Sequence, residues 1–173
     1  MNKIVSMATG TAVVAVLWFQ QQEIQTVHEE VQEIRSLIVQ TPQRVDYTAE
    51  DLQCLAKNIY HEAGVEPQAG QFAVAQVTLN RLRDGRWGKS VCSVVYARAQ
   101  FSWTLNARIR AEKPQGQLWE QSQTVARAVL EQGYRVPDLK DAVLYHAEYV
   151  NPYWTKSVSR IQQIGRHIFY QTG

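Results

Sequence analysis

Hydrophobic residues dominate one uncharged run in the first part of the chain, which small and hydroxyl side chains make only moderately hydrophobic. Lys3 precedes this run, which covers residues 4–19. It is slightly shorter than the about 17–25 apolar residues that cross a bilayer as a helix, and residues 20–22 extend it without adding charge. A basic residue before an apolar core is typical of an export signal, and no small-residue cleavage site follows. We therefore predict a single-pass transmembrane signal-anchor over residues 1–22, held in the cytoplasmic (inner) membrane through residues 4–22, with all later residues outside the cytoplasm.

A different spacing follows, in which apolar residues recur every three or four positions over residues 24–38. Glutamates lie between them, so the apolar positions form one stripe on an amphipathic helix. The stripe covers about two heptads, fewer than the three to four that indicate a coiled coil. We predict a helical stalk and linker over residues 23–44, where self-association through residues 24–38 and docking onto the next domain are both open. Pro42 then breaks the helix, and a compact domain is expected over residues 45–173.

The compact domain opens with a strong helix signal. Thr48 and Asp51 are spaced as in a capping box, and an apolar face of helical period runs from Leu52 to Ala63. Gly64 is a natural stop for this helix. Glu62 therefore falls in the last helical turn, beside apolar side chains.

Further helices and two strands complete the predicted domain. Hydrophobic periodicity predicts helices over residues 67–83, 90–97 and 117–132, and short β-branched or aromatic runs predict strands over residues 142–146 and 166–170. The expected fold class is therefore α+β, mainly α, with a small β-sheet near the C-terminus.

Charge and cysteine content narrow the range of partners. The formal net charge is only +2, and the chain lacks the clustered Lys and Arg residues that mark a nucleic-acid binder, so no nucleic-acid partner is expected. Cys54 and Cys92 are compatible with a disulfide, which export would allow, and with two buried small apolar side chains. Because export is predicted, we favour the bridge.

Several short motifs surround Glu62 and continue in order along the predicted domain. They begin with Ile59–Ala63 followed by Glu66-Pro67. The later blocks are Gly70–Val77, Leu79–Arg81, Val91–Tyr96, Gln100–Trp103, Tyr145–Ala147 and Ile164–Phe169. Together they resemble the SleB-like cell wall hydrolases, the family of spore cortex-lytic enzymes. That family usually has an arginine where this chain has Gly64, so any ion pair made by the arginine is absent here or supplied elsewhere.

The resemblance implies a lysozyme-like, lytic-transglycosylase-type fold that cleaves peptidoglycan glycan strands between N-acetylmuramic acid and N-acetylglucosamine. It places the catalytic general acid and base at Glu62, and no cofactor or metal is expected. The chemistry agrees, because a glycosidic oxygen is a poor leaving group and needs a proton from a carboxylic acid. Apolar surroundings and a helix C-terminus both raise the pKa of a carboxyl group, which suits Glu62 to this task.

Other residues are expected to contact the substrate. Glu66, the nearest carboxylate in sequence, is either such a contact or a first-turn residue that stabilises the second helix. By family position, the remaining candidates are Gln100, Phe101, Ser102, Trp103, Tyr145 and His146. Each of these positions is also compatible with a place in the core. A lytic transglycosylase can work with one glutamate, and we favour it over a muramidase that hydrolyses the same bond.

Two further functions are open. A zinc-dependent N-acetylmuramoyl-L-alanine amidase would draw on His61, His146 and His167, but Val65 stands where a His-Glu-x-x-His motif needs its second histidine. A non-catalytic wall-binding envelope protein would also suit the anchor and stalk. Residues 4–19 resemble the weak signal-anchors of some phage endolysins in composition, so phage lysis and bacterial wall remodelling are both open.

Overall fold

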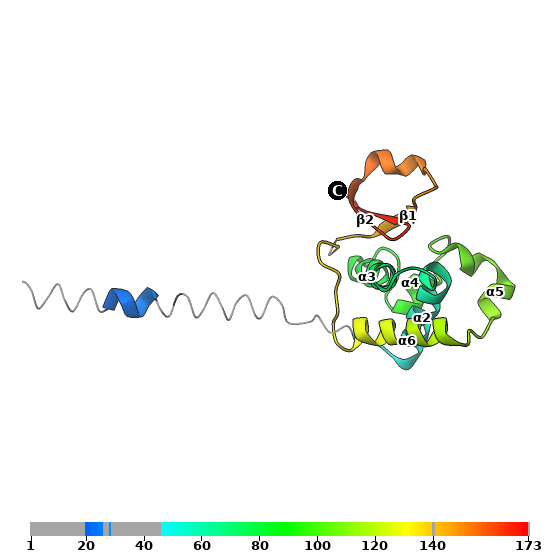
Figure 1. Cartoon of the computed structure of the whole chain (residues 1–173), viewed down its shortest axis with the longest axis horizontal. Helices are drawn as coiled ribbons and strands as arrows, with labels where there is room; N and C mark the ends of the chain where they lie inside the picture. Colours follow the sequence, from blue (N-terminus) through cyan, green and yellow to red (C-terminus); the bar gives the residue numbers. More distant parts are fainter. Residues whose placement is uncertain (1–19, 26–27, 29–45, 140, 173) are drawn as a thin grey trace, which may run out of the picture. The chain divides into compact units, whose positions relative to one another are not determined.

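The computed structural model describes residues 20–25, 28, 46–139 and 141–172 (Figure 1). The chain divides into two compact units, Met1–Thr41 and Pro42–Gly173, and the described residues of the first unit are helical. No helix in the described part of the chain is long and apolar enough to cross a bilayer. The predicted signal-anchor over residues 1–22 and the stalk over residues 23–44 lie almost entirely outside the described residues, so both stay predictions.

Helices make up most of the second unit. They are α2 (Ala49–Ala63), α3 (Gln68–Asp84), α4 (Val91–Val95), the 3₁₀-helix η1 (Ser102–Leu105), α5 (Ala107–Ala111) and α6 (Gln117–Leu130). The predicted capping box starts α2, because Thr48 and Asp51 each accept a hydrogen bond from the other's backbone N–H. At the end of α3, Gly85 has a φ of 77°, a left-handed conformation that terminates the helix. The short helices η1 and α5 were not predicted.

A small antiparallel sheet follows the helices. Its strands are β1 (Leu144–Ala147), β2 (Ser159–Ile164) and β3 (His167–Gln171), in the order β1-β3-β2. The predicted strands correspond to β1 and β3, whereas β2 was missed. The register between β2 and β3 shifts between Arg160 and Gln162. This irregularity breaks the period-two alternation by which a strand is identified in a sequence.

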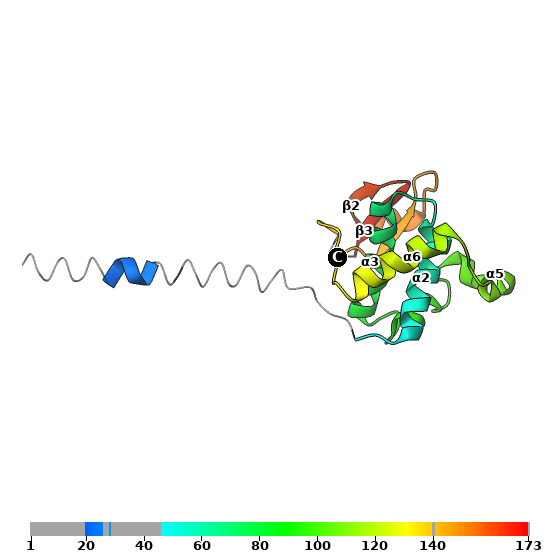
Figure 2. The same ribbon diagram turned by 60° about the horizontal axis from the view of Figure 1, so that its bottom comes forward.

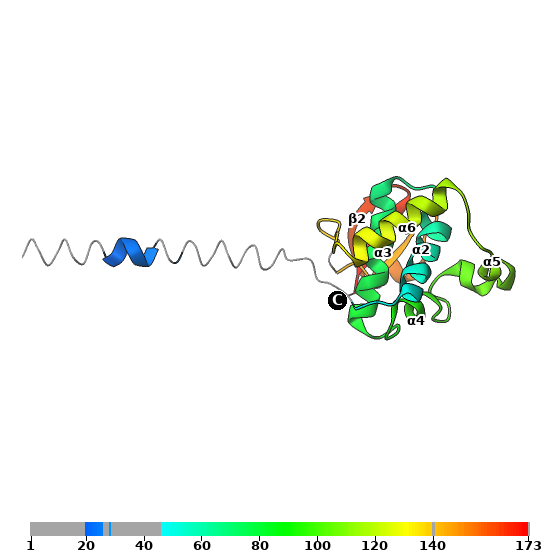
Figure 3. The same cartoon turned by 90° about the horizontal axis from the view of Figure 1, so that it is seen from below.

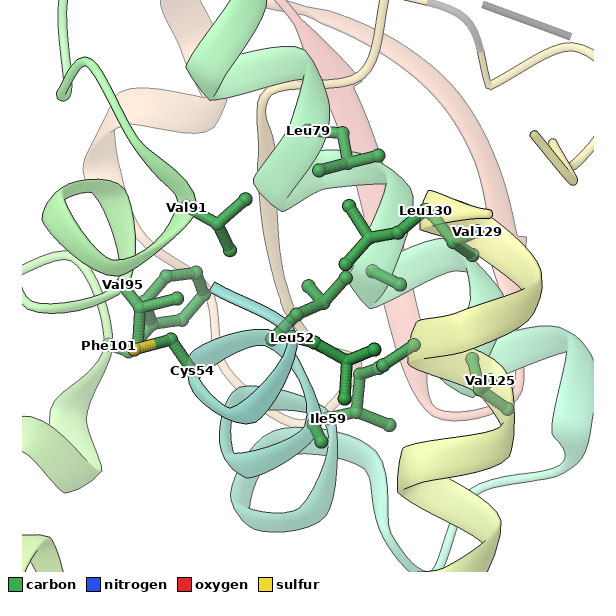
Figure 4. Close-up of a cluster of buried hydrophobic side chains, with 14 of the residues drawn as sticks. Leu52, Cys54, Ile59, Leu79, Val91, Val95, Phe101, Val125, Val129 and Leu130 are labelled. Carbon is green, nitrogen blue, oxygen red and sulfur yellow. The ribbon is translucent and has the colours of Figure 1, made fainter. Parts of the chain in front are cut away.

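One hydrophobic core joins α2 to the helices around it (Figure 4). Leu55 and Ile59 of α2 are fully buried in it, together with Leu130 of α6. A disulfide between Cys54 and Cys92 links α2 to the start of α4 at the edge of the same core. This core holds α2 in place along its whole length, up to the turn that carries Glu62.

Helix α3 lies between the other helices and the sheet, as Figures 1 and 2 show. Ala75 and Leu79 pack into the core formed with α2 and α6, whereas Ala73 and Val77 pack against Phe169 of β3. Seen from below, α2, α3 and α6 lie side by side and α5 projects at the periphery (Figure 3). Because α3 is buried on both sides, it fixes the distance between α2 and the sheet. Helix α2 and the sheet meet at Glu62.

Candidate active site

Glu62 and Tyr145 meet where α2 ends against β1. The Tyr145 hydroxyl donates a hydrogen bond of 2.8 Å to Oε2 of Glu62, across 83 positions in the sequence. Tyr145 pairs with Phe169 in the sheet, and its ring packs against the rings of Phe169 and His167. The Tyr145 ring is thereby held in one orientation, and its hydroxyl orients the carboxyl group of Glu62.

The pKa of Glu62 is raised above the ordinary value for a glutamate. Burial is the main cause, while the hydrogen bond from Tyr145 and the positive charge of Arg81 lower the pKa in part. Burial and the nearby charge of Glu62 also keep the pKa of Tyr145 well above its usual range, so the phenol stays a neutral donor. Glu62 thus keeps its proton to a higher pH than an exposed glutamate, which a general acid requires.

Arg81 is the cation of this site and was not predicted to have a role in it. Its side chain is buried, its Nε donates to the carbonyl of Val143 at 2.8 Å, and its guanidinium lies 4.9 Å from the centre of the Phe101 ring. Burial lowers the pKa of Arg81, and electrostatic interactions with Tyr145 and Glu62 oppose that effect. One sequence signal points to this role of Arg81: it is a charged residue among the apolar and amide side chains of α3.

Two of the predicted substrate contacts, Phe101 and Trp103, lie in the core. Phe101 is only 2% exposed. The Trp103 indole N–H donates to Oδ1 of buried Asn58 at 3.0 Å, and the Trp103 ring stacks on His61 at 4.5 Å. Trp103 thereby fixes the position of His61, the residue that precedes Glu62. The core alternative fits both aromatic residues, and their contact with a glycan stays a prediction.

The neighbouring candidates Gln100 and Ser102 reach solvent. Ser102 is exposed and Gln100 is half-buried, with its side-chain amide 3.5 Å from the carbonyl of Arg98. Both side chains are therefore free to meet a ligand at the surface. Their assignment as glycan contacts stays a prediction.

His146 follows Tyr145 in β1 and so faces the opposite side of the sheet. Its Nδ1 lies 2.9 Å from the carbonyl of Ala147, and its Nε2 lies 2.9 Å from the hydroxyl of Tyr170. With both ring nitrogens engaged, His146 is not a ready zinc ligand. Within the described residues, no three or more His, Cys, Asp or Glu side chains are grouped to hold a metal ion. This arrangement gives no support to the zinc amidase alternative.

Glu66 is engaged with the turn between β2 and β3. Its buried carboxylate accepts hydrogen bonds from the backbone N–H of Arg166 at 2.9 Å and from the Arg166 Nε at 2.7 Å. Burial acts to raise the pKa of Glu66, but these hydrogen bonds outweigh it and the pKa is lowered. Glu66 thus stays ionised with both carboxylate oxygens occupied, and Arg166 supplies the cation beside it. Substrate contact by Glu66 stays a prediction.

Gly165 allows the Glu66 carboxylate to approach the turn, and its replacement is expected to destabilise the fold. Its φ is +57°, and a Cβ atom there would lie 2.2 Å from Oε2 of Glu66. We expect Gly165→Ala to lower the free energy of unfolding by about 3 kcal/mol, through backbone strain and displacement of that carboxylate. Urea unfolding followed by circular dichroism measures the change.

Gly85→Ala is the matched control for Gly165→Ala. Gly85 has a φ of +77°, but a Cβ atom added there would meet only the flexible end of the Lys89 side chain, at 3.3 Å. It should therefore cost only the backbone strain, about 1–2 kcal/mol. Equal losses in the two variants would show that the approach of Glu66 to Gly165 contributes nothing to stability.

Comparison with known proteins gives one consistent result. Residues 65–170 match the Cell Wall Hydrolase family. The chain is 33% identical over 130 residues to the spore cortex-lytic enzyme of Oceanobacillus iheyensis and 30% identical over 128 residues to that of Bacillus subtilis. These matches cover 71% of this chain but only 42% and 38% of the two relatives, so the chain spans about two fifths of their length.

Solved structures extend the likeness to the fold. The catalytic domain of the germination-specific lytic transglycosylase SleB from Bacillus anthracis aligns with a TM-score of 0.61 and 26% identity, over 72% of this chain and 97% of that domain. The catalytic domain of the Bacillus cereus SleB protein aligns with a TM-score of 0.62 and 26% identity, over 76% of this chain and 98% of that domain. The mainly helical fold with a small antiparallel sheet is the fold of these domains. The family match begins after Glu62, so the role of Glu62 stays a prediction.

Proposed function

The chain belongs to the cell wall hydrolase family, and from this membership we propose that it is a lytic transglycosylase that cleaves the glycan strands of peptidoglycan. The bond that breaks joins N-acetylmuramic acid to N-acetylglucosamine. The observation that carries the proposal is the carboxyl group of Glu62, whose pKa is raised by burial and whose Oε2 accepts the Tyr145 hydrogen bond. The solved relatives with this fold include one named as a lytic transglycosylase.

In the first half of the reaction, Glu62 acts as the acid. It gives its proton to the glycosidic oxygen as the bond to the muramic acid anomeric carbon breaks, which releases the N-acetylglucosamine end as an alcohol. The Glu62 carboxylate that remains is stabilised by the Tyr145 hydroxyl and by the charge of Arg81. The same two groups that partly lower the pKa of Glu62 thus favour the transfer of its proton.

In the second half, Glu62 acts as the base. It takes the proton of the muramic acid's own primary hydroxyl, whose oxygen closes onto the anomeric carbon and forms an anhydro sugar. Water is not consumed, and Glu62 recovers its proton. This route needs one carboxylate, whereas hydrolysis by a glycosidase usually needs two. The engagement of both Glu66 oxygens by Arg166 favours the single-carboxylate route over the muramidase alternative.

The products separate the alternatives. Purified peptidoglycan is digested with the protein, and the soluble fragments are weighed by mass spectrometry. We expect fragments that end in anhydromuramic acid, lighter by one water molecule than hydrolysed ones. Hydrolysed reducing ends would replace the transglycosylase with a muramidase, and free stem peptides would show an amidase.

Removal of the Tyr145 hydroxyl should shift the pH dependence of the reaction. That hydroxyl stabilises ionised Glu62, so Tyr145→Phe raises the pKa of Glu62 further. An acid catalyst is active below its pKa, and the alkaline limb of the pH–rate profile should therefore move to higher pH. The maximal rate should fall, because the Glu62 carboxylate loses a stabilising donor. Fragment release measured across pH tests both effects.

Tyr170→Phe is the control for Tyr145→Phe. It removes a hydroxyl from the same sheet, but that hydroxyl lies 2.9 Å from His146 rather than near Glu62. The alkaline limb should stay in place in this variant. A shift of equal size in both variants would assign the effect to the sheet as a whole and contradict a specific action of Tyr145 on Glu62.

A further inference from the structure

A groove lined by polar side chains opens between the first turns of α3 and α6. Its volume is about 490 Å³, within the range of about 300–1,000 Å³ that small-ligand sites occupy. We call it the glutamine groove, because most of its walls are the side chains of Gln68, Gln71, Gln117, Glu120, Gln121 and Thr124. Glu62 does not line it, whereas Glu66, in the connection between α2 and α3, does.

The side chains from α6 offer their polar groups to solvent. Gln117, Gln121 and Thr124 follow one another at helical spacing, so they form a row on one face of α6, and all three are exposed. A primary amide supplies both donors and an acceptor. The Thr124 hydroxyl donates to the carbonyl of Glu120 and keeps its oxygen free to accept. This row is suited to a ligand that carries hydroxyl and amide groups together.

Gln71 connects the groove to the segment that follows Glu62. It is buried, and its Nε2 donates to the backbone carbonyl of Glu66 at 3.2 Å and lies 3.5 Å from that of Gly64. One side of the groove is therefore built on the connection between α2 and α3. A ligand in the groove lies beside this connection, in addition to any ligand at Glu62.

The charge of the groove selects against acidic ligands. None of its lining residues is a lysine, arginine or histidine. Glu66 is neutralised by Arg166, whereas Glu120 has no ion pair within the described residues. The net negative charge disfavours the carboxylates of peptidoglycan stem peptides. An uncharged sugar with hydroxyl and acetamido groups meets no such repulsion.

We propose that the glutamine groove is an accessory binding site for N-acetylglucosamine residues of a glycan strand, separate from the site of cleavage at Glu62. The identity of the ligand rests on the proposed function. The groove holds the polymer beside the α2–α3 connection while another part of the strand reacts. It therefore favours long strands over short fragments as substrates.

Binding of a pure sugar probe tests this proposal. The full-length protein carrying Glu62→Gln, which removes turnover, is titrated calorimetrically with the tetramer of N-acetylglucosamine in a detergent without a sugar head group. Gln121→Ala combined with Thr124→Val removes about two hydrogen bonds and should weaken binding about tenfold. The matched control is Gln53→Ala, an exposed glutamine of α2 outside the groove, and it should leave the affinity unchanged.

Each outcome decides for or against the groove. Unchanged sugar affinity in the double variant overturns the proposal, provided that its thermal unfolding matches that of the parent. A loss of affinity for free stem peptide, with sugar binding intact, also overturns it. Cleavage of peptidoglycan by the unmodified protein is measured separately. If cleavage occurs without any effect of the groove variants, only the accessory site fails; if the groove binds sugar without cleavage, only the proposed function fails.

Discussion

We expect Glu62→Gln to lower the release of soluble fragments from peptidoglycan by a factor of about 100–10,000, the range that general acid–base catalysis contributes. Glutamine has the shape of glutamic acid and can still accept the Tyr145 hydrogen bond, but it has no proton of suitable acidity to give to a glycosidic oxygen. Because Glu62 acts as both acid and base in the proposed reaction, its loss affects both steps. Fragment release from purified peptidoglycan, measured by chromatography and mass spectrometry, gives the ratio of the two rates.

The control for Glu62→Gln is Glu50→Gln, at the opposite end of the same helix. Glu50 is exposed in the first turn of α2, so its replacement removes one carboxylate without touching the site. This control should release fragments at the unmodified rate. Normal activity of Glu62→Gln would exclude Glu62 as the acid. Inactivity of the unmodified protein as well would favour the non-catalytic wall-binding alternative.

Loss of the disulfide is expected to cause the largest change in stability. The Cys54–Cys92 bridge spans 38 positions in the sequence, and closing a loop of that length in the unfolded chain stabilises the fold by about 4 kcal/mol. Cys54→Ala combined with Cys92→Ala should lower the free energy of unfolding by that amount. Urea unfolding of the oxidised protein and the double variant measures the difference.

Reduction of the unmodified protein supplies the internal control for the disulfide. A thiol reductant should shift its unfolding midpoint toward that of the double variant, whereas the double variant itself should not respond. Fragment release per folded molecule should stay similar, because neither sulfur contacts Glu62 or Tyr145. If the reductant left the unfolding midpoint of the unmodified protein unchanged, the prediction would be contradicted.

Local sequence signals predicted the helices well, because caps and apolar periods act over a few residues. The capping box of Thr48 and Asp51 starts α2, and α2 ends at the predicted stop, Gly64. Strand β2 was missed for a physical reason. Its apolar residues Ile161 and Ile164 are three positions apart, and the register shift beside Ile161 reconciles that spacing with a strand.

The site was predictable only in its motif residues. Glu62 was placed in the last helical turn from its neighbours, and Tyr145 was named by family position, but no local pattern indicates that the two side chains meet. The same holds for Glu66 and Arg166, which are 100 positions apart. The role of Arg81 cannot be read from local sequence, because Arg81 reaches the site through a contact with Val143, 62 positions away. Contacts between distant segments depend on the packing of the elements, which periodicity along the chain does not encode.

Glu62 and Tyr145 are 83 positions apart, so the environment of Glu62 depends on the completed fold. The ribosome synthesises Tyr145 after Glu62. Until the strands pack against α3, Glu62 has an ordinary solvated carboxyl group, which loses its proton below neutral pH. In the proposed reaction, an incomplete or unfolded copy therefore lacks a protonated acid at neutral pH.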